Sequence, residues 1–309
     1  RRRHRDERPK GAFAVFCTAS VASMILLSGA QGPLARQILP MLRDSQPVCA
    51  FDREQGEISD AGFISRLLDE SAAEAFIYCS DFEGLEQCER DLEGAYRSNA
   101  FVPADVARQC GERGVFFIYL STSHVFAGNA GRPYREDDET APLSAYGDSK
   151  LLGERLLKES GVRHAVVRLA EPYGREQMFF GGNFPWRLCD GVFRTIRDCI
   201  VSVVSASQIS EALLGIIAVK AEGLFHCAGE GSCRASEFLA AALDALGRRK
   251  GTRPAHRVEE LSYEEFTYPS ERPMYAALDC GKLSSLLGRP LAHWREAMEE
   301  SIARFGADL

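Results

Sequence analysis

Three side chains have the types and spacing that proton transfer to a carbonyl oxygen requires. Tyr146 and Lys150 are four residues apart, so they share one face of a helix. A nearby ammonium lowers the pKa of a phenol toward the neutral range, as general acid–base catalysis needs. Spacing alone favours an ordinary solvated pair. Thr122 favours a catalytic pair over a solvated one. It lies at the end of an apolar run that is expected to be a strand, and ligands bind at the carboxyl ends of strands in α/β sheets.

A second pattern, Gly29-x-x-Gly32-x-x-Ala35, follows the first apolar run and precedes a helix. Glycines at such a turn let a pyrophosphate approach the backbone at the helix N-terminus. Asp52 lies about 20 residues further on, where an acid can bond the adenosine ribose hydroxyls, whereas Arg53 beside it suits a 2′-phosphate. The pattern predicts a dinucleotide site and leaves both NAD and NADP open.

The elements that must position these residues alternate between short apolar runs and longer periodic ones. Strands are expected at 24–28, 48–51, 75–78, 115–120, 164–169 and 223–227, and helices at about 33–43, 60–70, 92–112, 144–160, 206–218, 235–246 and 290–305. Strands separated by helices of this length form β-α-β units. The expected fold is α/β, with a doubly wound parallel sheet of the Rossmann type and a smaller interleaved substrate lobe.

The same pattern divides the chain. Residues 24–174 are expected to form the dinucleotide-binding core, and residues 175–309 a mixed substrate lobe to which core elements return at about 200–227 and 277–305. Residues 1–23 are expected to be a disordered extension, because their charged part holds acids and their apolar part is poor in Leu and Ile. An organellar or secretory role for them is left open.

Composition narrows the functional classes. The net charge of −7 argues against a nucleic-acid-binding surface, and no apolar run is long enough to span a bilayer. The ten cysteines include no C-x-x-C pair, and none has a His at zinc-ligand spacing. We therefore expect reduced structural thiols, no metal site and a cytoplasmic location.

Six segments together resemble the extended short-chain dehydrogenase/reductase superfamily. Within it they most resemble the dTDP-4-dehydrorhamnose reductase family, whose non-catalytic relatives include the regulatory β subunit of methionine adenosyltransferase. The segments are ILLSGAQGPLA (25–35), STSHVFAG (121–128), GRPYREDDETAPLSAYGDSKLLGE (131–154), VVRLAEPYG (166–174), GNF (182–184) and RPMYAALDCGKL (272–283). The 131–154 block is the specific one.

The resemblance implies a catalytic set of Thr122, Tyr146 and Lys150. Tyr146 would give a proton to a 4-keto sugar while NADH or NADPH supplies hydride, Lys150 would hold the nicotinamide ribose, and Thr122 would bond the reacting oxygen. The implied cofactor-binding residues are Gly29, Gly32, Pro33, Leu34, Asp52, Ser80, Asp81, Tyr146 and Lys150, and the substrate-side residues are Thr122, Ser123 and Glu171.

The chain also departs from the family pattern, mostly on the substrate side. Ser123 and His124 stand where the family usually has Asp and Tyr, and Glu171 stands where it has Trp. Ser80-Asp81 replace an Ala-Ala pair that lies against the cofactor, where a carboxylate would repel a pyrophosphate. These changes leave the catalytic set intact and put the usual deoxysugar substrate in doubt.

The sequence therefore predicts an NAD(P)H-dependent reductase of a nucleotide-activated 4-keto sugar. The alternative is a non-catalytic subunit of the same fold that binds a dinucleotide and regulates or supports a partner protein. An epimerase or dehydratase of the superfamily ranks third, because the long match is to reductases. Binding of a small nucleotide sugar is expected; a homodimer and a regulatory partner both stay open.

Overall fold

The computed structural model describes residues 24–80, 82, 84–174, 186–189, 192–251, 257–265 and 270–305; the side chains of 186–189, 250 and 305 are outside this description. Asp81, the expected extension 1–23 and the GNF segment at 182–184 also lie outside the described residues.

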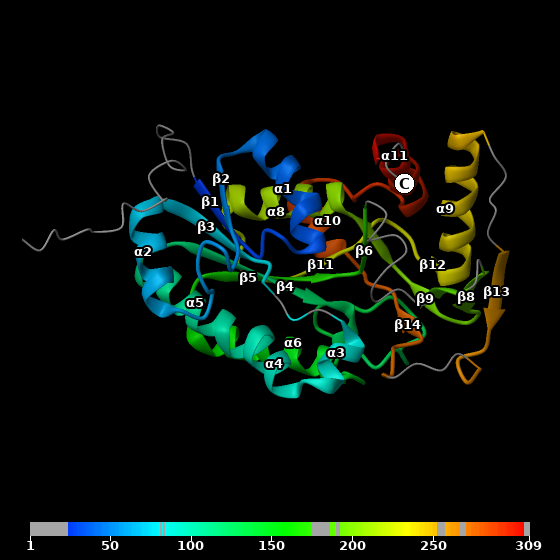
Figure 1. Cartoon of the computed structure of the whole chain (residues 1–309), viewed down its shortest axis with the longest axis horizontal. Helices are drawn as coiled ribbons and strands as arrows, with labels where there is room; N and C mark the ends of the chain where they lie inside the picture. The colour runs from blue at the N-terminus through cyan, green and yellow to red at the C-terminus, as the bar shows by residue number, and fades with distance from the viewer. Residues whose placement is uncertain are drawn as a thin grey trace, which may run out of the picture.

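A sheet of six parallel strands forms the centre of the fold (Figure 1), in the order β11-β5-β4-β3-β1-β2. The strands are β1 (Met24–Ser28), β2 (Val48–Phe51), β3 (Ala73–Tyr78), β4 (Phe116–Thr122), β5 (His164–Leu169) and β11 (Gly223–Cys227). All six were predicted from apolar runs. From β2 the chain crosses back to the other side of β1 to form β3, so the strand order changes direction between β1 and β3. Ligands bind at such a switch point in doubly wound sheets.

Helices cover both faces of this sheet, as Figure 1 shows. One face carries α1 (Pro33–Ser45), α8 (Ala206–Val219) and α10 (Gly281–Leu287), and the other carries α2 (Ala61–Ser71), α3 (Leu85–Arg90), α4 (Leu92–Tyr96), α5 (Val102–Glu112) and α6 (Ala145–Ser160). Each face buries its own apolar cluster against the strands. The predicted α/β doubly wound fold is confirmed.

The expected helix over 92–112 is continuous but contains a π-helical segment, Arg97–Phe101, between α4 and α5. Its cause is Pro103 in the first turn of α5. Proline has no N–H to donate to the carbonyl of Asn99 four residues earlier, and its ring clashes with that carbonyl in a regular helix. The Asn99 carbonyl instead accepts the hydroxyl of Tyr119 on β4.

A second group of elements packs around α9 (Ala235–Lys250) and α11 (Trp294–Phe305). It includes the sheets β13-β8-β7 and β12-β9-β14, built from β7 (Trp186–Cys189), β8 (Val192–Ile196), β9 (Ile200–Val201), β12 (Cys233–Arg234), β13 (Arg257–Leu261) and β14 (Tyr275–Ala276). Tyr173, Phe238 and Trp294 belong to its separate apolar cluster. The segment 277–305 divides between the two groups, because α10 packs on α8 and β11 whereas α11 packs on α9.

Two strands link the groups. β6 (Glu171–Tyr173) follows β5 and pairs in parallel with β10 (Val203–Ser205), which leads into α8. Ser205 caps α8 reciprocally with Gln208 in a capping box. Glu171 is therefore held at the junction between the main sheet and the second group.

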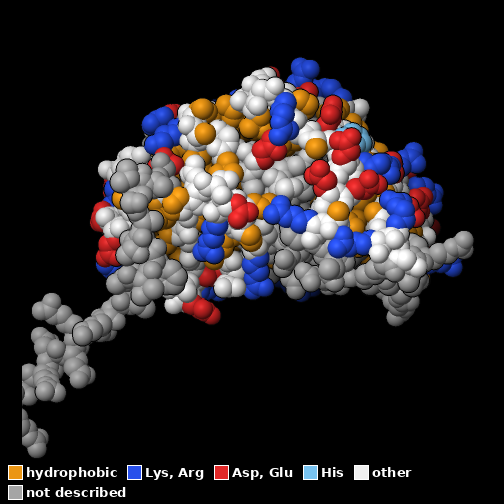
Figure 2. Space-filling model, turned by 90° about the horizontal axis from the view of Figure 1, so that it is seen from above, with side chains coloured by type: hydrophobic (Ala, Val, Ile, Leu, Met, Phe, Trp, Pro, Cys, Tyr) orange, Lys and Arg blue, Asp and Glu red, His pale blue; other side chains and the backbone are white. Residues whose placement is uncertain are grey.

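Surface and thiol chemistry are ordinary. No helix among the described residues is long and apolar enough to cross a membrane. On the face shown in Figure 2, acidic and basic side chains are interspersed rather than gathered into a single-sign patch. The eight cysteines with described side chains are free thiols; Cys79 and Cys227 are buried as expected, but Cys49 is only partly buried because β2 is an edge strand.

Candidate active site

The glycine turn lies at the carboxyl end of β1. Gly29 has a φ of +71°, and a Cβ there would lie 2.4 Å from the carbonyl oxygen of Cys79, so only glycine fits this position. Gly32 is the N-cap of α1 and makes no side-chain cap, and Pro33 and the buried Leu34 open the helix. The first turn of α1 holds no acidic residue. Its backbone N–H groups thus keep the capacity to bind an anion.

Asp52 follows β2 and faces this turn. Its Oδ2 accepts the backbone N–H of Gln31 at 2.7 Å, and its Oδ1 accepts the N–H of Arg53 at 2.7 Å. The Arg53 side chain is 82% exposed and lies 3.9 Å from Glu57. The carboxylate is therefore fixed beside the glycine turn, as expected for a ribose ligand, while the guanidinium extends into solvent.

The end of β3 forms the third side of this region. The backbone N–H of Cys79 donates to Ser28 Oγ at 3.2 Å, which ties the ends of β1 and β3 together. Ser80 follows and is half-buried. Of the predicted cofactor set, Gly29, Gly32, Pro33, Leu34, Asp52 and Ser80 all come from the carboxyl ends of β1, β2 and β3 and from the start of α1.

Thr122, Tyr146 and Lys150 come from the carboxyl end of β4 and from the start of α6, which packs on that strand. Thr122 ends β4, and Tyr146 and Lys150 lie in the first two turns of α6; the three side chains are buried. Lys150 Nζ donates to the carbonyl oxygen of Leu120 at 2.9 Å and lies 5.9 Å from the centre of the Tyr146 ring. The predicted ammonium is thus held next to the phenol by the strand that carries the threonine.

Gly147 explains how the first turn of α6 comes so close to the turn that follows β4. A Cβ at this position would lie 2.2 Å from the carbonyl oxygen of His124 and 3.0 Å from Pro142. Ser144 caps the helix by accepting the N–H of Gly147, and Glu89 of α3 accepts the N–H of Ala145. The glycine inside the Tyr-Gly-Asp-Ser-Lys run is therefore a packing requirement.

Asn99 is a residue of the site that sequence reasoning missed. It is fully buried in the π-helical segment, and its Nδ2 donates to Ser149 Oγ at 3.0 Å, between Tyr146 and Lys150 on α6. Its Oδ1 accepts the N–H of Phe82 at 2.8 Å, in the segment after β3. Asn99 thereby connects α6 to the β3 side of the site. The residue in the sequence that could have indicated the π-helical segment around Asn99 is Pro103.

The substrate-side residues are also buried. Ser123 is 1% exposed and follows Thr122 directly. His124 Nε2 lies 2.9 Å from Glu171 Oε1, and the imidazole ring packs edge-on against Tyr146 with 5.9 Å between ring centres. Glu171 was predicted on the substrate side, and His124 was noted as a departure from the family pattern; the structure joins the two in one hydrogen-bonded pair.

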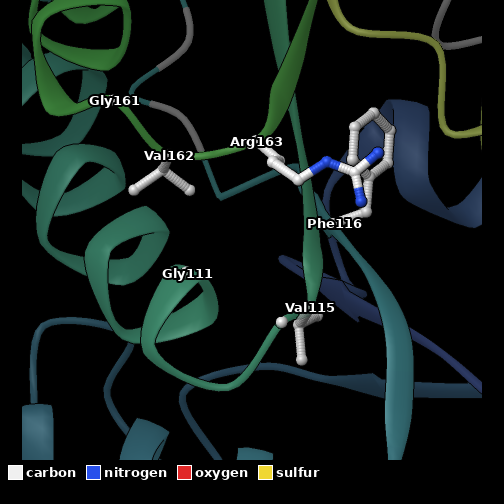
Figure 3. A pocket seen from close by; sticks show the side chains of 7 residues that line it. Gly111, Val115, Phe116, Gly161, Val162 and Arg163 are labelled. Carbon is white, nitrogen blue, oxygen red and sulfur yellow. The ribbon is translucent and has the colours of Figure 1, made fainter.

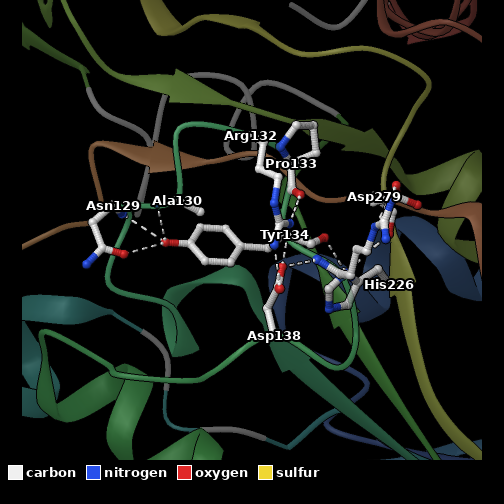
Figure 4. Close-up of polar contacts among 9 residues, drawn as sticks. Asn129, Ala130, Arg132, Pro133, Tyr134, Asp138, His226 and Asp279 are labelled. Carbon is white, nitrogen blue, oxygen red and sulfur yellow. Dashed lines mark hydrogen bonds and ion pairs between the residues drawn. The ribbon is translucent and has the colours of Figure 1, made fainter.

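A buried ionic network supports the far side of β4. Glu154 of α6 accepts from Ser121 Oγ and binds Arg168 of β5, with a shortest distance of 2.7 Å. Arg168 lies 3.5 Å from His226 Nε2, and His226 Nδ1 donates to the carbonyls of Tyr134 and Asp279 (Figure 4). This network ties the segment before α6 to β5, to β11 and to the start of α10.

A cavity of about 240 Å³ opens at the opposite edge of the sheet. It lies between the end of α5 and the amino ends of β4 and β5, lined by Gly111, Val115, Val162 and Arg163 (Figure 3). Thr122 is at the other end of β4, so this cavity is separate from the site. Among the residues that the structure describes, no three His, Cys, Asp or Glu side chains are grouped to hold a metal ion.

A doubly wound parallel sheet that gathers Thr122, Tyr146 and Lys150 beside a glycine turn defines an oxidoreductase of the short-chain dehydrogenase/reductase type. A family model described as the RmlD substrate binding domain matches residues 23–307. The chain therefore belongs to the RmlD substrate-binding-domain family.

Individual relatives agree with this assignment. The dTDP-4-dehydrorhamnose reductase of Mycobacterium tuberculosis (strain H37Rv) is 29% identical over 293 residues, which cover 92% of this chain and 94% of that protein. The spore coat polysaccharide biosynthesis protein SpsK of Bacillus subtilis is 26% identical over 282 residues, covering 89% and 95%.

Solved structures share the fold. A dTDP-4-dehydrorhamnose reductase from Clostridium acetobutylicum superposes with a TM-score of 0.78 at 27% identity, covering 91% of this chain and 99% of that one. The Bacillus anthracis dTDP-4-dehydrorhamnose reductase, solved in complex with NADP, gives a TM-score of 0.81 at 24% identity, covering 92% and 100%.

Proposed function

We propose that this protein reduces the keto group of a nucleotide-linked sugar with NADH or NADPH as hydride donor. One observation carries the proposal. Thr122, Tyr146 and Lys150 are all buried at the carboxyl end of β4 and the start of α6, and the Lys150 ammonium is held beside the ring of Tyr146. Family membership and relatives named as reductases of dTDP-4-keto sugars support it.

The residues at the carboxyl ends of β1 and β2 fit a dinucleotide. The uncapped N-terminus of α1 offers N–H groups and a positive dipole end to a pyrophosphate, and Gly29 and Gly32 bring the backbone close. Asp52 Oδ1 and Oδ2 keep lone pairs for the adenosine ribose hydroxyls. Ser80 would line the same region, and Asp81 belongs to the proposed set by its sequence position.

The chemistry of the reacting carbonyl falls to three residues. A bound reduced nicotinamide supplies hydride. Thr122 Oγ1 would donate a hydrogen bond to the carbonyl oxygen, and the Tyr146 hydroxyl would give that oxygen its proton as negative charge develops. Lys150 would stabilise the phenolate that results, and its buried position strengthens this effect because the local dielectric is low.

We assign the substrate side to Thr122, Ser123 and Glu171, and the dinucleotide-binding core to 24–174. Residues 175–309 would supply the interleaved substrate lobe, with segments that return to the main sheet. β6 and β10 join the two parts next to Glu171, so a sugar bound at Tyr146 would lie at this junction.

The experiment measures NADH or NADPH oxidation with dTDP-4-keto-6-deoxyglucose and dTDP-4-dehydrorhamnose. Tyr146→Phe is expected to lower turnover by about 100-fold or more, because the ring stays and the proton is lost. Dinucleotide binding, followed by fluorescence, should change little.

Tyr78→Phe is the matched control, because it removes a buried phenol that donates to the carbonyl of Ser98 in the π-helical segment. Its turnover should stay within about threefold of the wild type, since that hydroxyl does not face the triad. If the wild-type protein binds a dinucleotide but oxidises neither NADH nor NADPH with any nucleotide 4-keto sugar, that result would favour the regulatory-subunit alternative.

A further inference from the structure

His124 and Glu171 form a buried polar pair beside the phenol of Tyr146. The two side chains are 4% and 6% exposed, and His124 Nε2 lies 2.9 Å from Glu171 Oε1. They come from different elements, the turn after β4 and strand β6, and so face each other across the junction of the two parts of the chain.

The pair fixes which imidazole nitrogen carries the proton. A carboxylate only accepts hydrogen bonds, so Nε2 of His124 carries a proton and donates it to Glu171, which selects the Nε2–H tautomer of the imidazole. Nδ1 is then an acceptor. It is buried, and no described residue makes a hydrogen bond to it. A buried acceptor without a partner is costly, so this nitrogen points to a donor that arrives with a ligand.

The position of the ring identifies that ligand. The imidazole packs edge-on against Tyr146, and the backbone N–H of His124 donates to Thr122 Oγ1 at 3.2 Å. Lys150 Nζ, on the same helix as Tyr146, donates to the carbonyl of Leu120. A sugar whose carbonyl oxygen meets Thr122 and Tyr146 therefore places the carbons that flank the carbonyl next to His124.

We propose that His124, oriented by Glu171, is a specificity-determining residue that accepts a hydrogen bond from a hydroxyl on a carbon flanking the reacting carbonyl, or on that carbon's substituent. The inference rests on the proposed function. A deoxy sugar that presents hydrogen or methyl at this place leaves Nδ1 without a partner. Sites built to bond a substrate hydroxyl discriminate strongly against such analogues.

The test compares ligands that differ by one hydroxyl. Affinities of dTDP-glucose, dTDP-6-deoxyglucose and dTDP-3-deoxyglucose, and of the three UDP counterparts, are measured by calorimetry with oxidised dinucleotide present. We expect at least one deoxy sugar to bind about 10-fold or more weakly than its parent. In His124→Phe, which keeps the ring against Tyr146 and removes both nitrogens, that difference should fall below about threefold.

Val125→Ala is the matched control for general loosening of the turn, because Val125 is fully buried next to His124 and apolar. We expect Val125→Ala to lower the free energy of unfolding and to leave the affinity difference between parent and deoxy sugars unchanged. Equal affinities for parent and deoxy sugars in the wild type, or unchanged discrimination in His124→Phe, would overturn the role of His124. Failure of every sugar to bind while the dinucleotide still binds would instead contradict the proposed substrate class.

Glu171→Gln tests whether Glu171 orients His124, by a measurement that a purely structural role of Glu171 would leave unchanged. Nitrogen NMR of labelled histidine should show the Nε2–H tautomer of His124 in the wild type. In Glu171→Gln the amide can donate to Nε2, so this tautomer preference should weaken or reverse. An unchanged tautomer, together with unchanged sugar discrimination, would show that Glu171 does not position His124.

Discussion

Lys150 Nζ donates to the carbonyl of Leu120, two residues before Thr122 on β4. The same strand therefore fixes the cation and the threonine, and α6 needs only to bring Tyr146 over them. This makes the distance between α6 and the end of β4 the critical dimension of the site. Gly147 sets that distance, because the His124 carbonyl occupies the place of a Cβ.

Gly147→Ala should therefore push the first turns of α6 away from β4. We expect a loss of stability of about 1–3 kcal/mol, as for other overpacked sites, and a fall in kcat/KM of about 10-fold or more because Tyr146 moves with the helix. Urea unfolding and steady-state kinetics check the two effects.

Gly62→Ala is its control. Gly62 is in the first turn of α2, where an added Cβ contacts side-chain ends at 3.3 and 3.5 Å. Its kcat/KM should not change, and stability should change by no more than about 1 kcal/mol. Equal kinetics for wild type and Gly147→Ala would show that the close approach is not needed for activity.

At the scale of elements, α6 is held from several sides. Glu89 and Ser144 bind its first N–H groups, Tyr96 donates to Asp148, and this bond raises the pKa of Tyr96 to about 12. Deeper in the helix, Glu154 binds Arg168 of β5. The helix that carries Tyr146 and Lys150 is thus attached to α3, α4 and the central sheet, which fixes the positions of these two proposed catalytic side chains.

Glu154→Gln tests the deepest of these attachments. Removing the carboxylate charge leaves the buried Arg168 guanidinium uncompensated, which costs about 3–5 kcal/mol in comparable pairs. Urea denaturation should show this loss. The double variant Glu154→Leu with Arg168→Met should lose less than the sum of the single changes, since no charge stays buried alone. A loss below about 1 kcal/mol for Glu154→Gln would contradict this account.

At the scale of the whole molecule, His226 connects the central sheet to segments far apart in the chain. Its ring contacts Arg168 of β5 and the carbonyls of Tyr134 and Asp279, and its backbone N–H donates to Glu136. Burial, reinforced by the Arg168 charge, lowers the pKa of His226 from 6.5 to about 3. The histidine is therefore neutral in the folded protein over most of the acidic range.

This shift predicts a pH dependence of stability. Below about pH 6.5 the unfolded chain takes up a proton on His226 that the folded protein refuses until about pH 3, so stability falls as the pH drops through this window. The contribution is about 1–2 kcal/mol between pH 6.5 and pH 5. Urea unfolding across that range measures it. His226→Asn, which keeps a donor for the Tyr134 carbonyl, should show a flatter dependence; the same slope in both proteins would exclude His226 as its source.

Local hydrophobic periodicity and short motifs in the sequence predict the six strands of the central sheet, the doubly wound fold class and the candidate residues Gly29, Asp52, Thr122, Tyr146 and Lys150. The sequence does not predict β6 to β10, β12 or β14. It did not reveal β13, whose polar sequence becomes a strand only by pairing with β8.

Contacts between residues far apart in the sequence follow from the packing of the elements. Asn99 joins Ser149 across 50 residues of sequence, and His124 joins Glu171 across 47, with no local pattern to mark either contact. The physical reason is that both contacts depend on how elements pack and not on the conformation of either segment alone. The two departures from the family pattern at 124 and 171 looked independent along the chain; in the fold they are one hydrogen-bonded unit beside Tyr146.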